Sequence, residues 1–253
     1  PLQQNRPRTP ITDLKVHRKD LVVATQGRSF WILDDLTPLH TMQDQIRSRT
    51  LHVFQPRDAT LARFGATGGD RAPGNATNGV VVDYWVGAEP GQEVEIEVVD
   101  ASGRVIREFE GTVEAEGDDD GDGDAEEGAS SDDDAADDED ADETDDDALE
   151  DANLEEEELE VAPGMNRFVW DLRYPGPDVI PTAQFSLAYT GGAWAAPGPY
   201  RIRVAAAGEE QEVVVQVGLD PRIPSVTMDD MEAQFELTMD IRDHLTEVHA
   251  AIR

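Results

Sequence analysis

The chain contains no cysteine and only two lysines, Lys15 and Lys19. Without cysteine it has no disulfide, no thiolate nucleophile and no cysteine-ligated zinc site. It also lacks any apolar run of about eighteen residues, the least that a transmembrane helix needs, and it does not open with an apolar signal segment. Its 20 Lys and Arg residues against 56 Asp and Glu leave no basic stripe for a phosphate backbone. Nucleic-acid binding and membrane insertion are therefore not expected.

The acidic excess is concentrated in one tract. Residues 114–160 contain 28 acidic residues and no Lys or Arg. The rest of the chain carries 28 acidic and 20 basic residues, a net charge of −8 that is ordinary for a soluble domain. Because a segment with so much charge and so little apolar surface cannot form a core, we expect 114–160 to be disordered.

Short strands are predicted on both sides of this tract, which gives a mainly β fold. Residues 11–17 alternate apolar and polar, and 21–25 and 29–33 flank a predicted hairpin turn at 26–28. We assign 1–48 to a first region of short strands and a connector. Seven more strand-like segments indicate an immunoglobulin-like antiparallel β-sandwich over 49–222, with the acidic tract as an insertion within it. These segments are 51–54, 80–86, 93–100, 104–109, 165–174, 200–204 and 212–217.

The last segment, 223–253, changes to helical periodicity. Thr227 and Asp230 have the spacing of a capping box, and apolar residues including Met231, Phe235 and Met239 follow at helical intervals. We expect an amphipathic C-terminal helix, and the lack of a stop signal at its end indicates either truncation or docking on a partner surface.

One metal candidate lies inside the acidic tract. Asp118, Asp120 and Asp122 alternate and are followed by Gly123, as at the start of a calcium-binding loop. The twelfth position of such a loop is Ala129, where a bidentate glutamate is needed. Calcium is thus the one cofactor candidate, and a polyanion that condenses cations weakly is the alternative.

No catalytic residues are predicted. Asp34 and Asp35 are adjacent and project to opposite sides of an extended chain, which suits a turn better than a catalytic pair across a cleft.

Trp194, in a glycine-rich stretch, is a candidate for stacking on a sugar ring, with plugging of the core as the alternative. None of the five histidines belongs to a nucleophile or metal motif, and surface positions are expected for four of them, His17, His40, His244 and His249.

Residues 20–39, with the sequence DLVVATQGRSFWILDDLTPL, resemble the last blade segment of large bacterial BNR-repeat proteins. The resemblance implies that 1–48 is a residual last propeller blade and its connector. These are related to the sortilin (Vps10) β-propellers and are often labelled glycosyl hydrolases. Residues 164–174, 197–204 and 235–253 resemble the region after the propeller in the same family. The Asp-box pattern of the repeat is absent from this chain, so the resemblance supplies no Asp-box residue.

The resemblance implies an extracellular, periplasmic or cell-surface protein, in which this chain is a non-catalytic C-terminal region. Its expected role is to cap the propeller and to mediate contacts, with that propeller or another protein surface as partner. One alternative is a contribution to a glycoside hydrolase or exo-sialidase-like enzyme whose catalytic propeller lies outside this chain. The other is a carbohydrate- or calcium-binding sandwich, through Trp194 or through Asp118, Asp120 and Asp122.

Overall fold

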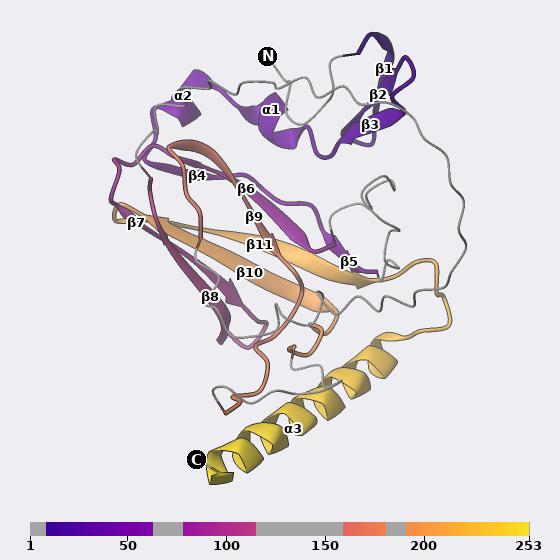
Figure 1. The fold of residues 1–253 in the computed structure, drawn as a ribbon, viewed down its shortest axis with the longest axis vertical. Coiled ribbons are helices and arrows are strands. Elements are labelled where there is room, and N and C mark those ends of the chain that lie inside the picture. Colours follow the sequence, from indigo (N-terminus) through magenta and orange to yellow (C-terminus); the bar gives the residue numbers. More distant parts are fainter. Residues whose placement is uncertain (1–8, 63–77, 115–158, 181–190, 253) are drawn as a thin grey trace, which may run out of the picture.

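The computed structural model describes residues 9–62, 78–114, 159–180 and 191–252. The fold is mainly β, with antiparallel sheets and one C-terminal helix, as predicted. Figure 1 shows a small N-terminal sheet above a two-sheet sandwich and a long helix below it. The acidic tract connects two strands of the sandwich, but most of it, including Asp118, Asp120 and Asp122, lies outside the described residues.

The N-terminal sheet has three antiparallel strands in the order β1-β2-β3. They are β1 (Ile11–His17), β2 (Asp20–Thr25) and β3 (Phe30–Leu33). The short helices α1 (Thr37–Thr41) and α2 (Asp44–Arg47) lead from this sheet to the sandwich. A propeller blade has four strands, so this sheet is one strand smaller than a blade.

The sandwich consists of a three-stranded and a five-stranded sheet. The smaller sheet has the order β4-β6-β9, and the larger one has the order β5-β11-β10-β7-β8. The strands of the smaller sheet are β4 (Leu51–Val53), β6 (Val80–Val86) and β9 (Gly164–Trp170). Those of the larger sheet are β5 (Ala59–Leu61), β7 (Glu93–Val99), β8 (Val105–Thr112), β10 (Gly198–Ala206) and β11 (Glu209–Leu219).

This strand order is that of an immunoglobulin-like sandwich. If β4, β6 and β9 are strands A, B and E, then β7, β10 and β11 are strands C, F and G of the opposite sheet. Near the start of β10, the Tyr200 hydroxyl donates a hydrogen bond to the Ala196 carbonyl over 2.8 Å. Such a bond is the tyrosine corner that accompanies this topology at strand F.

The core is formed by the alternating inward residues of the two sheets. Val80, Val82 and Tyr84 of β6 are fully buried and face Ile96 and Val98 of β7, which are also fully buried. This alternation follows from the two-residue period of a strand, as expected for the strand-like segment 93–100. The ring centroids of Trp170 and Tyr200 lie 4.9 Å apart within this core.

The acidic tract leaves and re-enters the sandwich at nearly the same place. The Glu114 amide donates to the Val161 carbonyl over 2.8 Å, and the Leu159 amide donates to the Glu110 carbonyl over 2.9 Å. These bonds join the two ends of the insertion beside the end of β8. Because the two ends of the insertion are hydrogen-bonded side by side, the sandwich accommodates an insertion of this length without a change of strand order.

The C-terminal helix α3 (Met228–Ile252) starts at the predicted capping box. The Asp230 amide donates to Thr227 Oγ1 over 3.2 Å, and the Thr227 amide donates to Asp230 Oδ2 over 2.9 Å. The helix is attached to the sandwich by the ring of Phe235, whose centroid lies 4.8 Å from that of Tyr174. Farther along, Thr246 Oγ1 accepts a hydrogen bond from the Asp178 amide.

Two local expectations differ from the structure. The strand predicted over 165–174 ends at Trp170, because Asp171 Oδ1 accepts the Arg173 amide in a turn and Leu172 takes a positive φ of 62°. Leu172 and Tyr174 nevertheless stay buried, since the chain after the turn still runs along the core. The short strand β5 was not predicted; it pairs with β11 in parallel, so no hairpin signal marks it.

Candidate functional site

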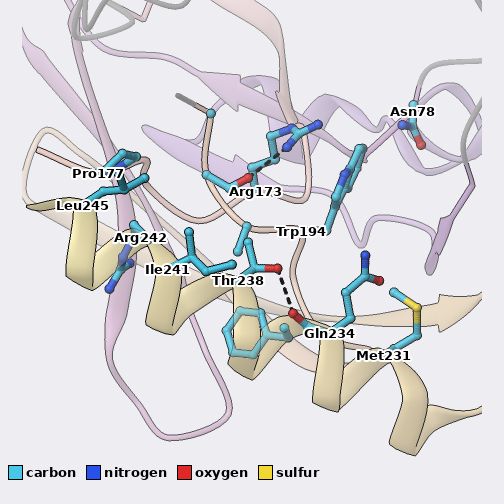
Figure 2. A pocket seen from close by; sticks show the side chains of 14 residues that line it. Asn78, Arg173, Pro177, Trp194, Met231, Gln234, Thr238, Ile241, Arg242 and Leu245 are labelled. Atoms are coloured by element: carbon cyan, nitrogen blue, oxygen red, sulfur yellow. Dashed lines mark hydrogen bonds between the residues drawn. The ribbon is translucent and has the colours of Figure 1, made fainter. Parts of the chain in front are cut away.

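A groove of about 550 Å³ separates α3 from the turn after β9 and the segment before β10 (Figure 2). These two segments pair with each other. The Tyr174 amide donates to the Ala193 carbonyl over 2.9 Å, and the Ala195 amide donates to the Leu172 carbonyl over 2.7 Å. A β-carbon at Gly192 would collide with the Tyr174 carbonyl, so the close approach of the two segments requires glycine. The wall of the groove is therefore held by backbone hydrogen bonds.

Trp194 lies in this wall and is half-buried. The Arg173 guanidinium carbon lies 4.1 Å from the centroid of the indole ring, a cation–π arrangement. Arg173 is itself oriented by a hydrogen bond of 2.9 Å from Nη1 to the Gly192 carbonyl (Figure 2). One face of the indole is thus in contact with Arg173, and a sugar ring at Trp194 would have only the opposite face for stacking.

The described side chains that line the groove are apolar and aromatic groups, amides, guanidiniums and one hydroxyl. Their side chains contain no carboxylate, imidazole, thiol or amine, which are the usual general acids, bases and nucleophiles. The Thr238 hydroxyl donates to the Gln234 carbonyl of its own helix over 2.8 Å. Met231, Ile241 and Leu245 supply an apolar floor. The floor of the groove is therefore formed by apolar side chains of α3.

Among the described residues, no group of three or more His, Asp or Glu side chains could hold a metal ion. Within those residues, no helix is both long enough and apolar enough to cross a bilayer.

Asp35 is half-buried and held by several polar contacts, whereas Asp34 is exposed. Asp35 accepts a hydrogen bond of 2.9 Å from the Thr37 amide and forms an ion pair of 3.2 Å with Arg57. Burial alone would raise the pKa of Asp35, but the Thr37 hydrogen bonds and the charge of Arg57 together lower it. Since Arg57 also pairs with Asp20 over 2.8 Å, this one arginine fastens the N-terminal sheet to the sandwich.

The histidines are dispersed, and one expectation about them is wrong. His17, His40 and His244 are exposed, as predicted, but His249 is buried. The Nδ1 atom of His249 lies 3.2 Å from the Ile180 amide and accepts its hydrogen bond. Helical periodicity alone could not reveal this, because the segment that covers His249 comes from the distant β9–β10 connection.

The N-terminal sheet exposes apolar side chains on both faces. Strand register places Leu14 and Val16 on one face and Phe30 and Ile32 on the other. Their exposed fractions are 55% and 58% on the first face and 72% and 61% on the second. In the same strand as Phe30, Trp31 and Leu33 are half-buried.

Sequence reasoning missed Leu14, Val16 and Ile32 as surface residues. The alternation over 11–17 was the available signal, but it predicted a strand without showing whether anything would cover its apolar face. Comparisons with protein families, with curated proteins and with solved structures found no match to this chain.

Proposed function

We propose that this chain is a non-catalytic accessory region that caps a β-propeller, with its N-terminal sheet packed against the propeller. The exposure of apolar side chains on both faces of β1–β3 carries this proposal. Blades of a propeller pack face to face around a central channel, so an inner blade needs apolar residues on both of its faces. An edge sheet that only covers a sandwich would need them on one face. The resemblance of residues 20–39 to a last blade segment agrees with this geometry.

The sandwich would serve as the platform for the capping sheet. Arg57 holds both Asp20, at the start of β2, and Asp35, just after β3, so the sheet has a fixed attachment to the sandwich. Burying Leu14, Val16, Phe30 and Ile32 against blades would contribute roughly 4–7 kcal/mol, scaled from full side-chain burial, before the entropic cost of association. A contribution of this size would measurably stabilise a propeller that otherwise lacks part of a blade. We place the assembled protein outside the cytoplasm, as in the family that this segment resembles.

The proposal is tested by mixing the chain with a BNR-type propeller that lacks its last-blade strands. Sedimentation velocity should show a 1:1 complex, and Phe30→Ser/Ile32→Ser should abolish it. The matched control is Val105→Ser/Val214→Ser, which changes two exposed valines of the sandwich to the same residue. Equal binding by both double variants, or no complex with the unsubstituted chain, would remove the basis of the proposal.

A further inference from the structure

The turn between β1 and β2 fixes which backbone groups of the N-terminal sheet are paired. It has two residues, Arg18 and Lys19, and both have a positive φ. Such a turn closes on a hydrogen-bonded pair, here His17 and Asp20, after which hydrogen-bonded and non-hydrogen-bonded pairs alternate along the strands. Because Val16 belongs to a non-hydrogen-bonded pair, its backbone groups point away from β2, to the outer edge of β1.

The same alternation identifies the residues at the outer edge of β3. In β2, Val23 lies opposite Leu14 in a non-hydrogen-bonded pair, so its N–H and C=O groups point towards β3 and bond its partner Trp31. The backbone groups of Phe30 and Ile32 therefore point away from β2. Among the described residues, no backbone hydrogen bond from another segment reaches these groups. Phe30 and Ile32 are 72% and 61% exposed, which leaves this edge accessible.

The edge of β3 lacks the protection that the edge of β1 has. Natural sheets guard a free edge with charged side chains. β1 contains Asp13 and Lys15, and Asp13 Oδ1 accepts a hydrogen bond of 2.9 Å from the Leu14 amide. By contrast, β3 (Phe30–Leu33) consists of apolar residues only. An apolar edge strand with unpaired backbone groups is the surface to which a further extended strand adds, with main-chain hydrogen bonds for affinity and side-chain contacts for specificity.

We propose that the outer edge of β3 accepts an extended strand of the propeller, so that the sheet becomes a four-stranded blade. A propeller blade has four strands and this sheet has three, which matches the one unprotected edge. The inference rests on the proposed capping function and deepens it by naming the contact. That contact consists of backbone hydrogen bonds at Phe30 and Ile32, in addition to the packing of their side chains.

The test uses two propellers and residue-resolved amide hydrogen exchange. Both propellers lack the last-blade strands that this chain would supply, and only the first keeps the remaining strand of that blade. With the first propeller, the amides of Phe30 and Ile32 should exchange roughly tenfold or more slowly than in the free chain, because they become hydrogen-bonded. The amide of Val16, at the opposite edge, should keep its exchange rate. With the second propeller, the Phe30 and Ile32 amides should stay unprotected.

A proline substitution tests the same hydrogen bonds through affinity. Ile32→Pro removes an outward amide and leaves the β2–β3 ladder intact, because an edge strand tolerates proline where its N–H faces solvent. The matched control is Ile32→Ala, which shortens the same side chain and keeps the amide. Ile32→Pro should bind the first propeller roughly tenfold or more weakly than Ile32→Ala does. Circular dichroism checks that both variants are folded, and the exchange measurement on the unsubstituted chain does not depend on them.

The outcomes separate this inference from the capping function. No complex with either propeller would remove the capping function and the strand addition together. A complex in which the Phe30 and Ile32 amides keep their free exchange rates would overturn the strand addition alone. Protection of Val16 in place of Phe30 and Ile32, or equal binding by Ile32→Pro and Ile32→Ala, would overturn it as well.

Discussion

Truncation of Phe235 should detach α3 from the sandwich, and the cost can be worked from the structure. A fully buried Phe→Ala change costs ~3–5 kcal/mol. Phe235 is half-buried, with its ring 4.8 Å from Tyr174, so about half of that value applies. We expect Phe235→Ala to lower the free energy of unfolding by ~1.5–2.5 kcal/mol. The change should appear in urea denaturation followed by circular dichroism at 222 nm.

The matched control is Leu237→Ala, two residues farther along the same helix, where the side chain is 62% exposed. It should change the free energy of unfolding by about 0.5 kcal/mol or less, since surface substitutions usually fall within that range. Amide hydrogen exchange shows which elements lose stability in each variant. In Phe235→Ala the amides of α3 should exchange faster, while those of β6 and β7 keep their protection. Equal losses of stability in the two variants would refute the assignment of Phe235 to the face of α3 that packs on the sandwich.

Three other substitutions test the packing and the charges. Arg57→Met should cost ~1 kcal/mol by thermal denaturation, because it removes the ion pairs that join the N-terminal sheet to the sandwich. Folding lowers the pKa of Asp35, so the ionised carboxylate stabilises the folded state at neutral pH, and this stabilisation is lost as the pH falls below about 4. The free energy of unfolding should therefore differ less between pH 7 and pH 3 in Arg57→Met than in the parent chain. Burial and neighbouring glutamates raise the pKa of Glu95, so its charged form destabilises the folded state at neutral pH. Glu95→Gln should therefore raise the free energy of unfolding at pH 7 by roughly 0.5 kcal/mol, and this gain should vanish at pH 3, where Glu95 is neutral. The buried Tyr84 hydroxyl has no hydrogen-bond partner among the described residues, and burial raises its pKa to about 12. Tyr84→Phe should therefore leave the free energy of unfolding unchanged or raise it by up to about 1 kcal/mol. A loss of stability would show that the hydroxyl has a partner.

The sequence predicted those elements whose signal is local. The alternation of Val94, Ile96 and Val98 was enough to predict β7 and its buried face, because the period of a strand is two residues. Thr227 and Asp230 predicted the start of α3 for the same reason, since a capping box lies within one turn.

What the sequence did not reveal depends on distant segments. The burial of His249 depends on the Ile180 segment, and the groove at Trp194 depends on the pairing of the segment before β10 with the turn after β9. Strand register decided that Leu14 and Ile32 face opposite sides of their sheet without a cover. No periodicity in a single segment carries such information, because it arises only when the elements are assembled.

The central claim, that the β1–β3 sheet caps a propeller, is tested most directly by the thermal unfolding of that propeller. A BNR-type propeller without its last-blade strands should unfold at a higher temperature when the chain is added in excess, as expected for a partner that binds only the folded state. With Phe30→Ser/Ile32→Ser the melting temperature should return to that of the propeller alone. An unchanged melting temperature with the unsubstituted chain, in a propeller that is already fully stable, would contradict the account.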